Sequence, residues 1–154
     1  MSAFIYDAVR TPRGKARPDG GLAALKPQQL VSGLVRAMAE RGADVSKPDA
    51  LILGAVGQIG AQGGHIALIS KFDAKLPDET AALSINNYCV SSLTAIGQAA
   101  AAVVSGQARS VLAGGVEMMS RVPFMADNAD YYADASYDRR TRYIPVALAA
   151  DRLA

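Results

Sequence analysis

One apolar segment constrains the fold of this chain more than any other feature. Residues 93–104 read Leu-Thr-Ala-Ile-Gly-Gln-Ala-Ala-Ala-Ala-Val-Val, and no residue from Ser91 to Ser105 carries a charge. The segment predicts a helix over 91–105, and a helix with almost no polar face is buried on all sides. We therefore expect more protein around this helix than one layer of sheet supplies.

Apolar runs of strand length alternate with helical segments along the chain. Pro27 suits the first turn of a helix, and Gly42 supplies a stop for it. Alternation of strands and helices predicts an α/β fold with a mostly parallel, helix-covered sheet. We predict strands over 3–9, 50–56, 81–87 and 110–115, and helices over 27–41, 65–71 and 91–105.

The texture of the sequence changes after the last predicted strand. Between residues 118 and 142 it contains Pro, Asn, several Asp and three Tyr, without a clean period. We therefore divide the 154 residues into a core, residues 1–115, and the start of a loop-rich region, residues 116–154. A helix that begins at Pro145 reaches Ala154 without a C-terminal signal, and we expect the chain to be truncated there.

Composition excludes several classes of function. Sixteen basic residues against 14 acidic ones give a net charge of +2, which is too small an excess for nucleic-acid binding. Cys89 is the one cysteine and His65 the one histidine, so neither an intramolecular disulfide nor a Cys/His zinc site is expected. We expect no signal peptide, because the first residues reach Asp7 without a preceding basic cluster, and no apolar run approaches the roughly 20 residues of a membrane span. We expect no metal, no membrane partner and a cytoplasmic location.

Cys89 is the candidate nucleophile of the chain. It follows the predicted strand that ends at Asn87 and precedes the helix that begins near Ser91. Active sites of parallel sheets lie at this carboxyl edge, and the partial positive charge of a helix N-terminus favours a thiolate over a thiol. A lone cysteine is also often a small buried apolar residue, so the position alone leaves both interpretations open.

The residues around Cys89 add a family resemblance. Asn86-Asn87-Tyr88-Cys89-Val90-Ser91-Ser92-Leu93 resembles the active-site segment of thiolases, with an asparagine three residues before the nucleophile and a serine two after it. Four further segments match the family in order. They are Arg10-Thr11-Pro12-Arg13-Gly14, the glycine-rich loop from Gly54 to Gly64, residues 113–120 beside the family's Gly-Gly-Met-Glu-Ser-Met-Ser, and Ala150-Asp151. The chain is similar to the N-terminal part of a thiolase.

This resemblance implies a thiolase-like fold, of which the chain is the N-terminal half with the start of a loop domain. It also implies an acyltransferase of fatty acid metabolism, either an acetyl-CoA acetyltransferase or a 3-ketoacyl-CoA thiolase. Cys89 would carry the acyl group in a ping-pong cycle of thiolytic cleavage or, in the reverse direction, Claisen condensation of acetyl-CoA, and its backbone N–H would be one oxyanion donor. Coenzyme A thioesters are then substrates, no cofactor is needed, and the full-length form is a homo-oligomer, a dimer or tetramer.

Departures from the family pattern limit what this chain does alone. Ser92 stands where the family usually has glycine, and Pro145-Val146 stands where a Met-Gly pair often precedes the closing helix. The family's activating histidine, second catalytic cysteine and water-binding asparagine all come from the later half of its sequence. We therefore expect the isolated chain to be inactive.

Other residues leave alternatives open. His65 is either a catalytic substitute or a loop or subunit-contact residue, and the loop from Gly54 to Gly64 is either a phosphate cradle or a set of tight turns. The glycine-rich loop keeps a nucleotide-binding α/β domain open as a third function, beside a non-catalytic thiolase-like subunit that only associates with partners. The candidates for contacts with the phosphates or the acyl chain of the substrate are Arg139, Arg140, Arg142, Met118 and Met119, each of which has a solvated or packing role as its alternative.

Overall fold

In this computed structural model, residues 2–134, 136 and 143–153 are described. The chain divides into two compact units, Met1–Phe124 and Met125–Ala154. All of the described strands and the three longest described helices belong to the first unit. The division of the chain into residues 1–115 and 116–154, which rests on the change in composition, stays a prediction.

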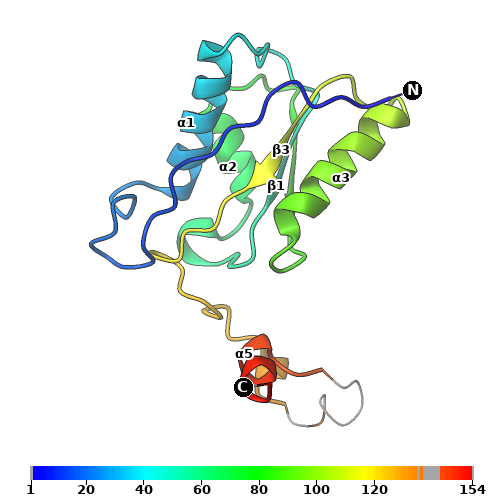
Figure 1. Ribbon diagram of the computed structural model, residues 1–154. Coiled ribbons are helices and arrows are strands. Elements are labelled where there is room, and N and C mark those ends of the chain that lie inside the picture. Colours follow the sequence, from blue (N-terminus) through cyan, green and yellow to red (C-terminus); the bar gives the residue numbers. More distant parts are fainter. Residues whose placement is uncertain (1, 135, 137–142, 154) are drawn as a thin grey trace. The chain divides into compact units, whose positions relative to one another are not determined.

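A parallel sheet of three strands is the centre of the first unit. Its strands are β1 (Ala50–Gly54), β2 (Ala81–Ile85) and β3 (Val111–Gly115), in the order β2-β1-β3. Gly54 at the end of β1 pairs with Ile85 on one side and with Gly115 on the other. All three strands therefore end at the same edge of the sheet. The predicted parallel α/β architecture is confirmed (Figure 1).

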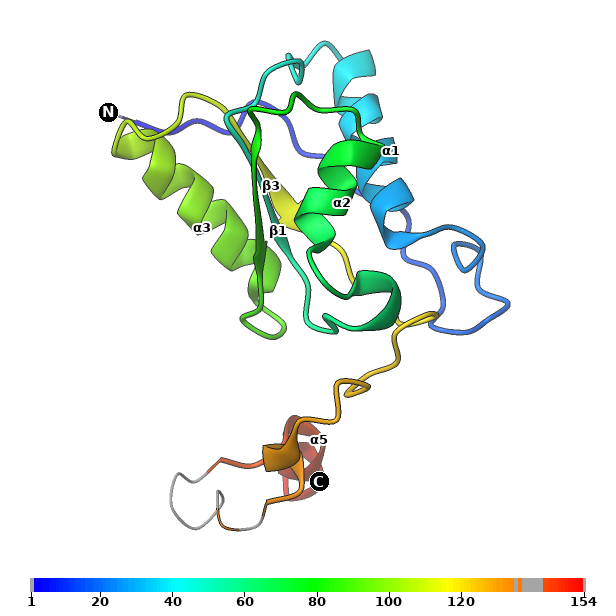
Figure 2. The same cartoon turned by 180° about the vertical axis from the view of Figure 1, so that it is seen from behind.

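Helices cover both faces of this sheet. α1 (Pro27–Glu40) and α2 (Ile66–Asp73) lie on one face, and α3 (Ser91–Val104) lies on the other (Figures 1 and 2). Pro27 is the first residue of α1, and Gly42 follows the helix with φ +92°. The three helices match the sequence predictions to within about two residues at each end.

Successive side chains of β1 pack into two different cores, one on each face of the sheet. Leu51 and Leu53 pack with the residues of α1 and α2, whereas Ile52 points to the other face and meets Ala95 and Ala99 of α3. The side chains of a strand point alternately to its two faces, so one apolar strand serves two cores.

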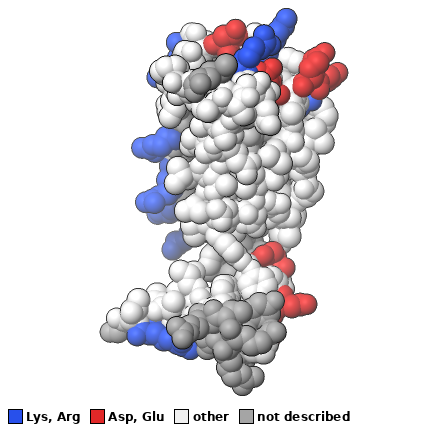
Figure 3. All heavy atoms as spheres, turned by 90° about the vertical axis from the view of Figure 1, so that its right-hand side faces the viewer, with Lys and Arg blue, Asp and Glu red and all other residues white. Residues whose placement is uncertain are grey.

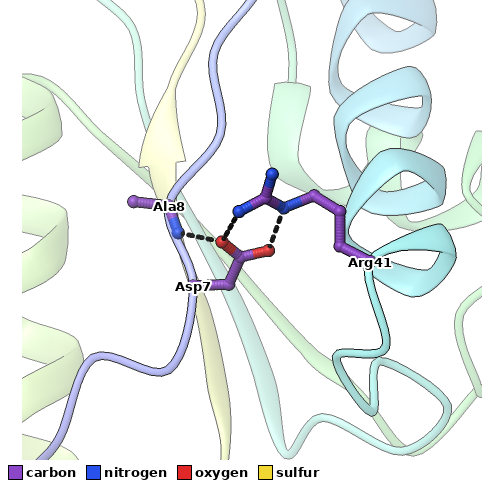
Figure 4. Close-up of polar contacts among 3 residues, drawn as sticks. All are labelled: Asp7, Ala8 and Arg41. Atoms are coloured by element: carbon purple, nitrogen blue, oxygen red, sulfur yellow. Dashed lines mark hydrogen bonds and ion pairs between the residues drawn. The ribbon is translucent and has the colours of Figure 1, made fainter.

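The predicted strand over residues 3–9 is wrong. The segment has the composition of a strand, but no described residue pairs with it in a sheet, and Phe4, Ile5 and Tyr6 are exposed. A strand forms only when a neighbour accepts its backbone hydrogen bonds. The segment is held instead by an ion pair between Asp7 and Arg41, just beyond α1, with an N···O distance of 2.8 Å (Figure 4).

α3 departs from the prediction of burial on all sides. Its buried residues are Ser91, Ala95 and Ala99, which face the sheet, whereas Leu93 is 67% exposed and Ile96 40% exposed. Figure 3, which looks onto the side of α3, shows a broad surface without charged side chains. Within the described chain the sheet covers one side of this helix only, so its apolar outer face meets solvent.

The described residues of the second unit include two short elements, η2 (Asp130–Tyr132) and α5 (Val146–Asp151). The Tyr131 ring makes edge contacts with the rings of Tyr132 and Tyr143, at centroid distances of 4.8 and 5.5 Å. α5 confirms a helix that starts after Pro145, but this helix ends at Asp151, with Arg152 as its C-cap, and does not continue through Leu153. Among the described residues of both units, no helix has the length and apolar character needed to cross a membrane.

Gly54 allows the first turn of α3 to sit directly on the end of β1. A Cβ at this position would lie 2.6 Å from the backbone nitrogen of Ser92. We expect Gly54→Ala to lower the free energy of unfolding by about 1–3 kcal/mol, because the backbone must shift. Gly97→Ala is the control: its Cβ would meet nothing within 4 Å, and we expect about 0.5–1 kcal/mol of stabilisation. Urea unfolding measures both, and equal effects would contradict this explanation.

The Asp7–Arg41 ion pair should make the order of residues 3–9 depend on pH. The hydrogen bond from Arg41 holds the pKa of Asp7 below its usual value. The contact is therefore fully formed above the unfolded pKa of about 3.9 and is lost as the pH falls through the lower, folded value. Heteronuclear NOEs of the Ile5 and Tyr6 amides should fall below pH 4 in the wild type. In Arg41→Gln they should be low at every pH, and a pH-dependent fall in that variant would refute the assignment.

Candidate active site

Cys89 lies in the turn of residues 86–90 that joins β2 to α3. Its thiol is free and exposed to solvent. The turn begins where β2 ends, at the edge that the carboxyl ends of all three strands share, and α3 starts two residues after the thiol. The strand-to-helix position predicted for Cys89 is therefore the one it occupies, and the alternative of a buried apolar cysteine is wrong for the described chain.

The backbone of this turn is shaped by polar side chains on both sides of Cys89. Tyr88 has φ +48°, a left-handed conformation that costs energy for a side chain of this size. The N–H of Tyr88 donates to Oδ1 of Asn86 at 2.9 Å, and Ser91 Oγ accepts from the N–H of Asn87 at 2.9 Å. These local bonds stabilise a backbone conformation that would otherwise be unfavourable.

The backbone N–H of Cys89 differs from the two N–H groups that follow it. The next two N–H groups, of Val90 and Ser91, donate to the carbonyls of Asn87 and Tyr88 at 3.3 and 3.0 Å. Within the described residues, by contrast, no acceptor takes the N–H of Cys89. An exposed thiol and a backbone donor thus belong to one residue, an arrangement suited to attack on a carbonyl whose oxygen becomes an anion.

Ser92 fits the first turn of α3 because the facing position is glycine. A Cβ on Gly115 would overlap Ser92 Oγ and would lie 2.8 Å from the carbonyl oxygen of Gly54. Ser92, which stands where the family usually has glycine, is therefore accommodated by the missing side chain of Gly115 on β3. The N-terminal end of α3, which follows the turn of Cys89, is fitted to two glycines on paired strands.

The glycine-rich loop after β1 is occupied by a carboxylate. Glu117 Oε2 accepts from the N–H of Val56 at 2.6 Å, and Oε1 accepts from the N–H of Gly57 at 3.2 Å. Oε1 also accepts from Nε2 of Gln62, a side chain with no exposed surface. Donors that a phosphate cradle would offer are already used, and the carboxylate repels a phosphate, so this loop does not support the nucleotide-binding alternative.

Sequence reasoning missed the roles of Glu117 and Gln62. Glu117 lies 61 residues after Val56 in the chain, and nothing local to either residue marks the contact. Its acidic side chain directly after an apolar strand was the one available signal, because such a residue needs donors nearby.

His65 is the N-terminal cap of α2. Its Nδ1 accepts from the N–H of Leu68 at 3.2 Å and lies 2.9 Å from Ser84 Oγ. Both contacts are structural, and Cys89 is not among its described hydrogen-bond partners. The structure thus gives His65 a local role in the fold.

The remaining candidates do not converge on Cys89. Met118 is buried and Met119 is 42% exposed, while Arg139, Arg140 and Arg142 lie outside the described residues. An open pocket of about 870 Å³ adjoins residues 115–120, but Cys89 does not line it. Its walls include Arg10, Arg13, Lys15, Leu30, Leu34 and Glu117. Among the described residues, no group of three His, Cys, Asp or Glu side chains is placed to hold a metal ion.

Comparison with known proteins identifies the family. The model of the thiolase N-terminal domain matches residues 3–148. A beta-ketoadipyl-CoA thiolase of Pseudomonas knackmussii is 40% identical over 129 residues, which are 82% of this chain and 32% of that protein. One from Acinetobacter baylyi is 39% identical over 83% of this chain and 32% of its own length. A steroid 3-ketoacyl-CoA thiolase of Mycobacterium tuberculosis is 38% identical over 79% of this chain and 30% of its own length.

The chain thus spans about a third of the length of these relatives. The matched region includes the exposed cysteine, the turn that carries it and the helix that follows. This chain belongs to the thiolase family, and its residues 3–148 match the N-terminal domain of that family.

Proposed function

We propose that Cys89 is the acyl-carrying nucleophile of a thiolase-type acyltransferase. One observation supports this most: an exposed thiol stands at the carboxyl edge of a parallel sheet, directly before a helix, with its own N–H unpaired within the described chain. Membership of the thiolase family supplies the type of reaction.

The proposed chemistry follows from a cysteine sulfur beside a hydrogen-bond donor. Sγ of Cys89 attacks the keto carbon of a 3-ketoacyl-CoA, and the bond between that carbon and the α-carbon breaks. The α-carbon leaves as the enolate of acetyl-CoA and takes up a proton. The thiol of a second CoA then attacks the acyl-enzyme, which releases a shortened acyl-CoA and returns the thiol of Cys89. The Claisen condensation is the same sequence in reverse.

The substrates that we propose are 3-ketoacyl-CoA thioesters. The relatives are described as thiolases of beta-ketoadipyl-CoA and of steroid 3-ketoacyl-CoA, which share the ketone two bonds from the thioester. Coenzyme A itself is the acyl acceptor, so the proposed reaction needs no separate cofactor. A homo-oligomer in the cytoplasm remains our expectation for the full-length form.

We further propose that these 154 residues do not turn over by themselves. A thiolase needs a base for the thiol and an acid for the leaving enolate, and the family resemblance assigns both to residues beyond those matched here. His65 caps α2 and is engaged there. The reaction of the isolated chain would therefore stop at the acyl-enzyme, after one acyl transfer to Cys89.

Mass spectrometry of the purified chain tests the nucleophile. Incubation with acetyl-CoA should attach one acetyl group per chain, and peptide mapping should locate it at Cys89. Cys89→Ser should not form the thioester adduct, while steady-state release of products from acetoacetyl-CoA should be undetectable for both chains. Acetylation elsewhere would exclude the proposed nucleophile, and turnover at a normal thiolase rate would refute the proposed inactivity.

A second candidate function, association without chemistry, is favoured by the outer face of α3. Leu93 and Ile96 are exposed on a helix without charged residues, and Val90 just before it is 50% exposed. An apolar surface of this kind marks a contact with another protein surface. The catalytic and associative roles are separable, because the exposed side chains are not those that hold the turn of Cys89.

Size-exclusion chromatography should show that the wild-type chain self-associates. The double variant Leu93→Lys, Ile96→Lys should shift it toward the monomer, since the charges repel at the apolar face while Ala95 and Ala99 still pack on the sheet. An unchanged circular dichroism spectrum in the double variant is the check that only the outer face of α3 was altered. A compact monomer for the wild type at every concentration would contradict the associative role.

A further inference from the structure

We infer that Asn86 and Glu117 are positioning residues for Cys89, connected to each other through the peptide groups of Val56. The inference rests on the proposed function, because it concerns how the proposed nucleophile is held. It adds two residues that touch neither the thiol nor a substrate and that act through the backbone of the turn.

The first link is between Asn86 and the residue before the nucleophile. Oδ1 of Asn86 accepts from the N–H of Tyr88 at 2.9 Å. Tyr88 has φ +48°, and a bond to its N–H is one of the interactions that offset the strain of that conformation. The direction in which the chain enters Cys89 therefore depends on where the Asn86 amide is held.

The second link fixes that amide. Nδ2 of Asn86 donates to the carbonyl oxygen of Val56 at 3.2 Å, across 30 residues of sequence. The two ends of one side-chain amide are thus used together, one on the turn and one on the loop after β1. A shift of Val56 moves the amide and, with it, the acceptor of the Tyr88 N–H.

The third link fixes Val56. Its N–H donates to Glu117 Oε2 at 2.6 Å, and Gly57 donates to Oε1 at 3.2 Å. Bonds to an ionised acceptor are the stronger ones. Both oxygens of Glu117 accept, so a glutamine in its place would turn an NH₂ group toward an N–H whichever way the amide lay.

Glu117 is itself anchored by a buried side chain. Gln62 donates from Nε2 to Glu117 Oε1 at 2.8 Å, and its Oε1 accepts from the N–H of Met118 at 2.5 Å. The connected bonds run from the segment after β3, through the loop after β1, to the turn after β2. They tie together the ends of three strands, and the thiol lies on the last of the three segments.

The test uses the purified 154-residue chain and four variants. Glu117→Gln removes the anchor of Val56, and Asn86→Ala removes the acceptor for Tyr88. The double variant of these two measures their coupling, and Glu40→Gln, an exposed acid on α1, is the charge-matched control. Hydrogen exchange of the Tyr88 amide is measured by NMR, and the limiting rate of Cys89 acetylation is measured against acetyl-CoA concentration.

We expect Asn86→Ala to speed Tyr88 exchange and to slow limiting acetylation by about tenfold, the effect of one lost hydrogen bond. Glu117→Gln should produce about a threefold change in the same directions, and the double variant should add little to Asn86→Ala. The acetyl-CoA concentration that gives half the limiting rate, and exchange of the β1 amides, should not change. Glu40→Gln should match the wild type.

Several results would overturn the inference. One is an effect of Glu117→Gln that adds fully to that of Asn86→Ala, because the two residues would then act independently. Another is a parallel increase in exchange for β1 and Tyr88, which would mean that Glu117 only stabilises the fold. If Glu117→Gln does not fold, Asn86→Asp decides. It keeps an acceptor for Tyr88 but loses the donor to Val56, so wild-type Tyr88 exchange in this variant would refute the connection.

Failure of the proposed function gives a different pattern. A wild-type chain that acetyl-CoA never acetylates at Cys89 contradicts the nucleophile, whatever the exchange data show. The hydrogen exchange of Tyr88 still decides whether Asn86 and Glu117 hold the turn. If Asn86→Ala and Glu117→Gln are instead both acetylated at the wild-type rate, the nucleophile stands, but a positioning role for these two residues is excluded.

Discussion

The close contact between the first turn of α3 and the ends of two strands is the constraint on which the rest of this structure depends. Gly54 and Gly115 pair across the sheet, and side chains at either position would collide with Ser91 or Ser92. Because neither glycine has a side chain, the helix can start at the edge of the sheet itself. The preceding turn then has room for only a few residues, and this places Cys89 beside a helix N-terminus, at the carboxyl edge where parallel sheets present their reactive groups.

Much of the fold could be predicted because its signals are local. Pro27 and Gly42 mark the ends of α1, and the apolar run of β1 predicts a strand buried on both faces. The segment over residues 3–9 shows the limit of local signals. Its composition is that of a strand, but pairing depends on a neighbour that composition cannot supply. The exposed face of α3 has the same origin. Its apolar residues predict burial, but the described chain contains no element that covers its outer face.

The candidate site, like the fold, could be predicted from the sequence only in part. The position of Cys89 follows from the strand before it and the helix after it, so sequence reasoning could place it. The turn's support could not be found in that way, since Glu117 meets Val56 across 61 residues and Asn86 meets it across 30. His65 drew attention as the single imidazole, yet it serves as a cap for α2. Rarity in the composition is a weaker guide to function than the donors and acceptors that surround a residue.

We expect the connected hydrogen bonds of Glu117, Val56 and Asn86 to form in a fixed order during folding. The pairing of β1 with β2 encloses a shorter stretch of chain than the contact between Val56 and Glu117, which must wait until β3 has joined the sheet. Long loops close more slowly and at a higher cost in entropy. We therefore expect the thiol to reach the sheet edge during folding before its turn is fully held, and the geometry around Cys89 to be among the last features of the first unit to form.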